Sequence, residues 1–187
     1  MLLISFTCRR INLLIKPYFI GEIYIFSLTI YYIQFMNEKQ TPTVETQMLI
    51  RKPKEIVFQA FIDPEITTNF WFTKSSGPLE VGKVVTWEWE MYGVSTNVLI
   101  KEIIPNRLIN TEWGDPATTV IYEFTALTDD TTYVVIKNYG FKEKGDDLIQ
   151  AIIDNTGGFT TVLDGLKAYL EFGVRLNLIG DKFPHIK

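Results

Sequence analysis

The stretch "TGGFTTVLDGLKAYLEFG", Thr156 to Gly173, decides the fold of this 187-residue chain. Its large apolar residues fall on one helical stripe, at Phe159, Leu163, Leu166 and Leu170. The other side carries Asp164, Lys167 and Glu171. The pattern predicts a long amphipathic helix that packs its apolar stripe against a sheet.

Two glycines, Gly157 and Gly158, stand just before the first aromatic residue of this stripe. Glycine in a helix interior costs about 1 kcal/mol relative to alanine. We therefore expect a short helical segment from Asp146 to end here and the main helix to begin at Phe159 in a new direction, with Thr156 as its N-cap. The alternative is a single tolerated kink. In either case the pair would give the helix start room to move and a ligand a route inward.

The residues before this helix are arranged as a strand, two short helices and a run of strands. Val44 to Ile50 favours a strand, and "KPKEIVFQAFID" favours a helix with Pro53 in its first turn. Asp63 and Pro64 end that helix and can cap the next one.

From Val84 onward, alternation of period two takes over. In "VVTWEWEM" one face carries Val85, Trp87, Trp89 and Met91. Further strands are expected at Val94 to Ile104, Arg107 to Trp113, 119–127 and 131–141. In the last two, one face carries Val120, Tyr122, Phe124 and Ala126, then Thr132, Val134, Ile136 and Asn138. Strands this closely spaced must form an antiparallel meander, so the chain is of the α+β class.

Composition excludes several classes of function. The net charge is −4 and the sequence shows no basic stripe, which argues against nucleic acid as a partner. The single cysteine, Cys8, gives neither a disulfide framework nor a thiolate metal site. No cofactor and no metal is expected.

Residues 1–35 differ in character from the rest of the chain. The run "YFIGEIYIFSLTIYYIQF" has one charge in eighteen residues and follows three basic residues. It is predicted to be either translation from a start placed too early, with Met36 as the true start, or a membrane anchor. A cleavable signal peptide fits less well, because no small-x-small site follows the run. Residues 36–187 are expected to form the domain, in the cytoplasm unless 1–35 is an anchor.

Catalytic groups are scarce in this sequence. The only histidine, His185, follows a proline near the C-terminus, where solvation is the better interpretation. Glu88 and Glu90 alternate with tryptophans and are expected on a solvated sheet face. Glu112 would act as a base only if it pointed into an apolar interior. An enzyme is therefore less favoured than a binding protein.

Three stretches carry a resemblance to a known superfamily: Lys52 to Phe72, Asp129 to Phe141, and Gly157 to Glu171. With the strands between them, they resemble the START-like helix-grip (SRPBCC) superfamily, and within it bacterial relatives of the C-terminal domain of the activator of the heat-shock protein 90 ATPase. The sequence departs from the family where Gly82-Lys83 replaces a glycine pair and where Asn138 replaces a frequent histidine.

The resemblance implies a curved antiparallel sheet wrapped around the long C-terminal helix, with two short helices after the first strand and an apolar cavity between sheet and helix. The residues expected to line that cavity are Trp71, Phe72, Trp87, Trp89, Trp113, Tyr122, Phe124, Thr132, Asn138, Phe159 and Leu163. The function this favours is non-enzymatic binding of a hydrophobic small molecule or lipid. The alternatives are an interaction domain with a chaperone partner, like the activator, and a polyketide cyclase-like enzyme.

Overall fold

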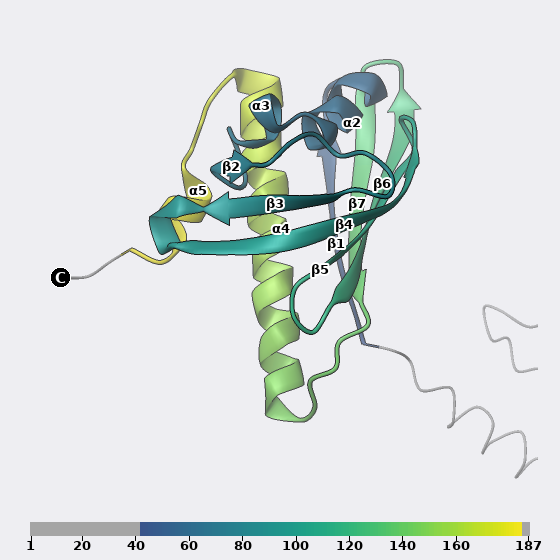
Figure 1. The fold of residues 1–187 in the computed structure, drawn as a ribbon. Helices are drawn as coiled ribbons and strands as arrows, with labels where there is room; N and C mark the ends of the chain where they lie inside the picture. The colour runs from purple at the N-terminus through teal and green to yellow at the C-terminus, as the bar shows by residue number, and fades with distance from the viewer. Residues whose placement is uncertain (1–41, 185–187) are drawn as a thin grey trace, which may run out of the picture. The chain divides into compact units, whose positions relative to one another are not determined.

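The computed structural model describes residues 42–184. Within this range the strands form one antiparallel sheet in the order β1-β7-β6-β5-β4-β3-β2 (Figure 1). The strands are β1 (Thr43–Ile50), β2 (Lys74–Ser75), β3 (Val84–Trp89), β4 (Val94–Ile104), β5 (Leu108–Trp113), β6 (Thr118–Thr128) and β7 (Thr131–Tyr139). The leader, 1–35, and His185 lie outside the described residues.

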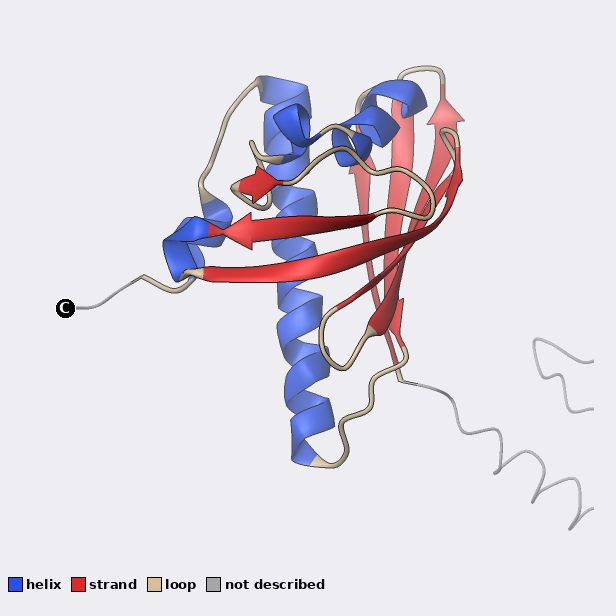
Figure 2. Cartoon of the chain, viewed as in Figure 1, coloured by secondary structure: helices blue, strands red, loops and turns tan. Residues whose placement is uncertain are grey.

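The helices lie on one side of the sheet. They are α2 (Lys54–Ile62), α3 (Pro64–Thr67), α4 (Asp146–Phe172) and α5 (Leu178–Lys182), with a 3₁₀ turn η1 at Glu90–Tyr92. Figure 2 shows strands β3 and β4 crossing over α4, while the rest of the sheet curves around beside the helix. This is the α+β helix-grip architecture predicted from the sequence. Among the described residues, no helix has both the length and the apolar character to span a membrane.

The meander is confirmed, and period-two alternation explains its register. In β7 the side chains of Thr132, Val134, Ile136 and Asn138 are all fully buried. Two details of the prediction are wrong. Ala126 is exposed, because the last four residues of β6, which lead to the turn to β7, are all exposed. Met91 lies in η1, because the chain turns at Gly93, whose φ of 63° suits glycine.

The two short helices also follow the prediction. Pro53 occupies the N-cap position of α2, and α2 buries Val57, Phe58, Ala60 and Phe61. The Asp63 side chain accepts a hydrogen bond from the Glu65 backbone N–H at 3.0 Å, which caps α3 as expected.

The predicted break at Gly157 and Gly158 is wrong, because α4 runs through both glycines as one helix. Thr156 is not a cap. Its hydroxyl donates to the Ile152 carbonyl at 2.7 Å, a bond typical of a threonine inside a helix. The helix instead ends at Gly173, where φ is 68° and the backbone N–H donates to the Tyr169 carbonyl. Burial of the apolar stripe outweighs the cost of two interior glycines.

The glycine that does mark a close approach is Gly165. A Cβ placed there would lie 3.0 Å from the Phe70 carbonyl oxygen and 3.2 Å from the Phe70 Cβ. Gly165 is itself buried on the stripe of α4. The absence of a side chain here lets α4 pack directly on the backbone that follows α3.

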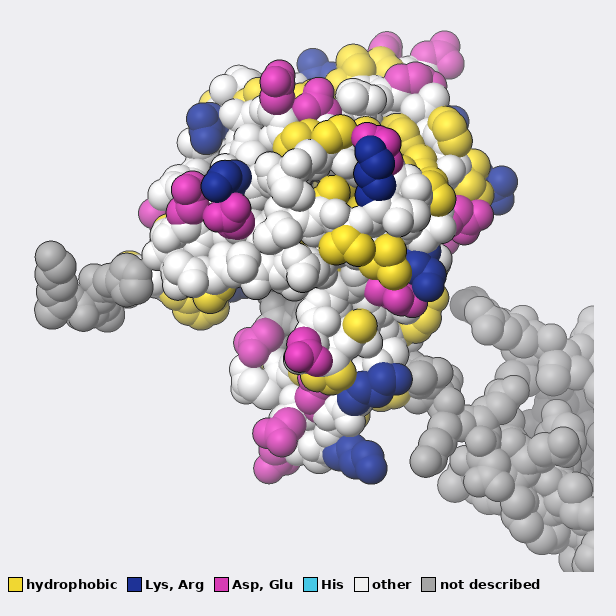
Figure 3. Space-filling view, in the orientation of Figure 1, with side chains coloured by type: hydrophobic (Ala, Val, Ile, Leu, Met, Phe, Trp, Pro, Cys, Tyr) yellow, Lys and Arg dark blue, Asp and Glu magenta, His cyan; other side chains and the backbone are white. Residues whose placement is uncertain are grey.

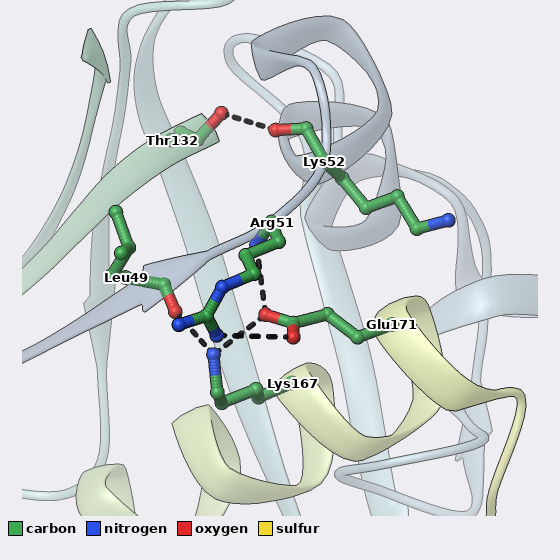
Figure 4. Close-up of polar contacts among 6 residues, drawn as sticks. All are labelled: Leu49, Arg51, Lys52, Thr132, Lys167 and Glu171. Carbon is green, nitrogen blue, oxygen red and sulfur yellow. Dashed lines mark hydrogen bonds and ion pairs between the residues drawn. The ribbon is translucent and has the colours of Figure 1, made fainter. Parts of the chain in front are cut away.

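The charged side of α4 contacts the end of β1. Lys167 donates from Nζ to the Leu49 carbonyl at 2.7 Å and to Glu171 Oε1 at 2.6 Å. Glu171 Oε1 also accepts from the Arg51 backbone N–H at 2.8 Å, and only 5% of the Glu171 side chain is exposed. Figure 4 shows this polar latch, defined as Arg51, Lys167 and Glu171, between the end of β1 and α4.

Candidate functional site

The predicted site residues lie between the concave face of the sheet and α4. Most of them are buried: Trp71, Phe72, Trp87, Tyr122, Phe124, Thr132, Asn138, Phe159 and Leu163. Trp89 and Trp113 are half-buried and pack against the same cluster. The structure therefore brings the predicted aromatic residues together, with side chains from α4, from strands β3, β5 and β6, and from the segment after α3.

Trp71 is the centre of this aromatic cluster. Its ring lies within 6.4 Å, centroid to centroid, of the rings of Phe61, Phe72, Trp87, Trp113, Tyr122 and Phe159. Phe72 stacks on Trp87 at 4.7 Å with an interplanar angle of 20°. Rings at these separations are in contact, so a ligand can lie among them only if some of them move apart.

Phe159 does not lie at a mobile helix start as expected. It sits in the continuous part of α4 with 2% of its surface exposed. Its ring packs on Trp113 at 5.7 Å and on Trp71 at 6.3 Å. Access to the cluster must therefore come from another direction.

The two predicted polar groups behave differently. The Thr132 hydroxyl donates to the Lys52 carbonyl at 2.8 Å, so it joins β7 to the chain just before α2 (Figure 4). Asn138 donates from Nδ2 to Thr118 Oγ1 and to the Thr119 carbonyl, both at 3.0 Å. Its Oδ1 is buried without a hydrogen-bond partner among the described residues.

Two further buried polar atoms in this region have no hydrogen-bond partner within residues 42–184: Trp87 Nε1 and the Tyr122 hydroxyl. Burial raises the pKa of Tyr122 far above its ordinary value, and the neighbouring Thr111 side chain offsets this only in part. Buried polar groups in native proteins are nearly always hydrogen-bonded, and an unpaired one costs about 1–3 kcal/mol. An aromatic cluster with unpaired polar atoms can thus bind a mainly apolar molecule that carries a polar group.

The carboxylates considered as bases lie away from the cluster. Glu88 pairs with Lys74 at 3.2 Å and Glu112 pairs with Lys101 at 3.3 Å, each about one-third exposed. In the described part of the chain, no group of three or more His, Cys, Asp or Glu side chains is placed to hold a metal. Figure 3 shows acidic and basic side chains interspersed over the face in view.

The sheet, the short helices after β1 and the gripped helix α4 define the START-like helix-grip class. Residues 51–171 match the family described as Activator of Hsp90 ATPase homolog 1-like protein. The chain belongs to this family. No match was found among curated proteins.

Three solved structures illustrate the likeness. A protein from Staphylococcus saprophyticus is 32% identical, with 72% of this chain and 96% of that chain covered and a TM-score of 0.63. The Aha1 dimer from Colwellia psychrerythraea is 17% identical, covering 71% and 98%, with a TM-score of 0.61. An HSP90 activator from Plasmodium falciparum is 19% identical, covering 63% and 89%, with a TM-score of 0.51. The last two show a shared fold.

Sequence reasoning missed three features around the site. The buried stripe of α4 contains Gly165, and a glycine at helical spacing among large apolar residues is a readable signal of close packing. Lys167 and Glu171 are spaced as an i,i+4 pair, but the sequence does not show that they reach the end of β1. The third feature is Arg175, which follows α4 and lines a small pocket together with Trp71. No motif in the sequence marks this residue.

Proposed function

We propose that this chain is a non-enzymatic binding protein for a hydrophobic small molecule or lipid, held between the concave sheet face and α4. The observation that carries the proposal is the aromatic cluster around Trp71, which contains the unpaired polar atoms of Trp87 and Tyr122. A ligand with an apolar body and a polar group would replace ring–ring contacts and satisfy one of these atoms.

Binding would require the rings to separate, so its affinity is the difference between a favourable and an unfavourable contribution. Burial of ligand surface contributes about 25 cal/mol per Å², and association and rearrangement oppose it. A flat aromatic ring system or a single alkyl chain displaces fewer contacts than a bulky ligand. We expect these two shapes to bind best.

The test is a fluorescence titration with fatty acids and flat aromatic polyketides. All four tryptophans of the chain belong to the cluster, so intrinsic fluorescence reports on this region alone. We expect saturable quenching and a melting temperature that rises with ligand concentration. Absence of saturable binding for every apolar ligand would overturn the proposal.

A matched pair of variants locates the ligand. Tyr122→Phe removes an unpaired hydroxyl inside the cluster, whereas Tyr133→Phe makes the same change on the outer face of β7. We expect Tyr122→Phe to weaken binding of naphthol relative to naphthalene in calorimetric titrations, and Tyr133→Phe to change neither. Equal effects of the two variants would place the ligand elsewhere.

A chaperone partner is the second candidate, favoured by the family match over residues 51–171. In this alternative the domain binds its chaperone partner through its surface, and the aromatic cluster serves only as part of the hydrophobic core. Co-purification with a heat-shock protein 90 and stimulation of its ATPase would support it. The polyketide cyclase-like activity and the cytoplasmic location expected from the sequence stay predictions.

A further inference from the structure

The segment that follows α4 forms one wall of a small pocket. Residues 175–180 face Thr68 to Trp71 and Thr73 across it, with Met91 and Gly165 completing the lining. The cavity volume is about 90 Å³. In Figure 1 this segment runs from the end of α4 to α5, which lies beside the β3–β4 hairpin.

Arg175 is the only charged residue that lines this pocket. Among residues 42–184 its guanidinium has no hydrogen bond and no ion pair, in contrast to Arg51, which pairs with Glu171. A guanidinium presents several N–H donors in a planar fork that fits a carboxylate or phosphate. The pocket therefore offers an unused anion-binding group, and no acidic residue in the lining opposes an anion.

The residues at the floor of the pocket, Trp71 and Gly165, connect the Arg175 guanidinium to the aromatic cluster. Trp71 lines the pocket and also contacts Trp87 at 4.8 Å and Phe159 at 6.3 Å. Gly165 lines the pocket as well, so α4 presents no side chain at that point of the floor. A molecule whose polar end lies beside Arg175 would direct its apolar end at Trp71.

The residues that follow α4, 174–183, cover the pocket and are called here the covering segment. This segment is held by few contacts. The Tyr92 hydroxyl donates to the Ile179 carbonyl, and its ring packs edge-on against Phe183 at 6.2 Å. Lys182 donates to the Thr161 hydroxyl at 3.4 Å. Val174, Leu176 and Phe183 are each at least 45% exposed. Segments with little buried apolar surface open at a lower free-energy cost than the core.

We infer that this pocket binds the anionic end of an amphiphilic ligand, with Arg175 pairing to its carboxylate or phosphate and its apolar tail passing Trp71 into the aromatic cluster. Binding of the apolar tail in the aromatic cluster rests on the proposed function. The inference adds a binding site for the anionic head group and the route by which the tail enters. The covering segment moves aside to admit the tail. This segment follows the residues matched by the family, 51–171, so the wall that carries Arg175 lies beyond that match, whereas the opposite wall lies within it.

The experiment compares dodecanoate with dodecanol, which share a tail and differ in head-group charge. Wild type, Arg175→Gln and the control Arg107→Gln are titrated by tryptophan fluorescence at low salt. Arg107 is a suitable control because it is exposed, lies at the β4–β5 turn and does not line the pocket. We expect Arg175→Gln to weaken dodecanoate binding about five- to tenfold and to leave dodecanol unchanged, while Arg107→Gln changes neither.

The outcomes separate this inference from the proposed function. If wild type binds both ligands and Arg175→Gln weakens neither, or weakens both equally, the head-group site is overturned and interior binding stands. If wild type binds neither ligand, the head-group site is overturned, and the proposed function falls as well if flat aromatic polyketides also fail to bind. Arg175→Lys keeps the charge and should retain part of the preference for dodecanoate, so complete loss in this variant would also count against the pairing.

Discussion

Two glycines of α4 provide an internal test of how the helix packs. Gly158 and Gly165 both lie in the helix interior. A Cβ at Gly158 would meet nothing within 4 Å, whereas a Cβ at Gly165 would lie 3.0 Å from the Phe70 carbonyl oxygen. The same substitution, glycine to alanine, therefore meets open space at one position and backbone at the other.

The expected magnitudes follow from these two environments. Alanine is favoured over glycine in a helix interior by about 1 kcal/mol, partly through the unfolded chain, and this gain applies at both positions. Forcing a methyl group into a packed contact costs about 1–3 kcal/mol. Gly158→Ala should thus stabilise the protein by about 1 kcal/mol, and Gly165→Ala should be about 1–3 kcal/mol less stable than Gly158→Ala.

The assay is urea unfolding followed by tryptophan fluorescence, with the free energy of unfolding taken from the transition of each variant. A double variant should show the sum of the two effects within about 0.5 kcal/mol, since the positions are two turns apart. If Gly165→Ala is as stable as Gly158→Ala, the direct contact between α4 and the backbone at Phe70 is wrong, and with it the reason given for glycine at position 165.

Three further substitutions test the core and the polar latch. Leu163→Ala should cost about 2–5 kcal/mol in urea unfolding, because Leu163 is fully buried; a loss below about 1 kcal/mol would contradict the assignment of the stripe. Tyr122→Phe removes a buried hydroxyl without a partner and should leave stability unchanged or raise it by about 1 kcal/mol; a clear loss would show that the hydroxyl is bonded. Glu171→Gln should remove an acid-dependent part of stability. Burial favours a higher pKa for Glu171, but the bonds from Lys167 and Arg51 outweigh it and hold its pKa below the ordinary 4.5. A lowered pKa in the folded state stabilises the protein above the unfolded value, and this contribution is lost as pH falls below about 4.5. Wild type should therefore lose more stability than Glu171→Gln between pH 6 and pH 3, and parallel curves for the two proteins would refute the latch.

The sequence predicted the sheet well because alternation of period two directly encodes which side chains face the core. Thr132 to Asn138 alternate in the sequence, and the same residues are buried in β7. The helical stripe at Phe159, Leu163 and Leu166 was readable for the same reason. Both patterns record burial, which supplies most of the favourable free energy of folding.

The errors arose where tertiary contacts overrule local preference. Gly157 and Gly158 predict a break on propensity alone, yet the stripe on either side of them is buried by the sheet, and the helix continues. The contacts of Lys167 and Glu171 were not predicted, because nothing in the local sequence shows that the end of β1 passes beside them. The position of the unpaired Arg175 is set by the path of the chain after α4. No hydrophobic periodicity in the sequence predicts that path.

The central claim is that an apolar ligand binds between the sheet and α4. It is tested most directly by recording the indole N–H signals of the four tryptophans by two-dimensional NMR during titration with dodecanoate. We expect the signals of Trp71, Trp87 and Trp113 to move together and to saturate, and the Trp87 signal to move because its unpaired Nε1 lies in the cluster. Four indole signals that stay in place while dodecanoate is raised to millimolar concentration would contradict it.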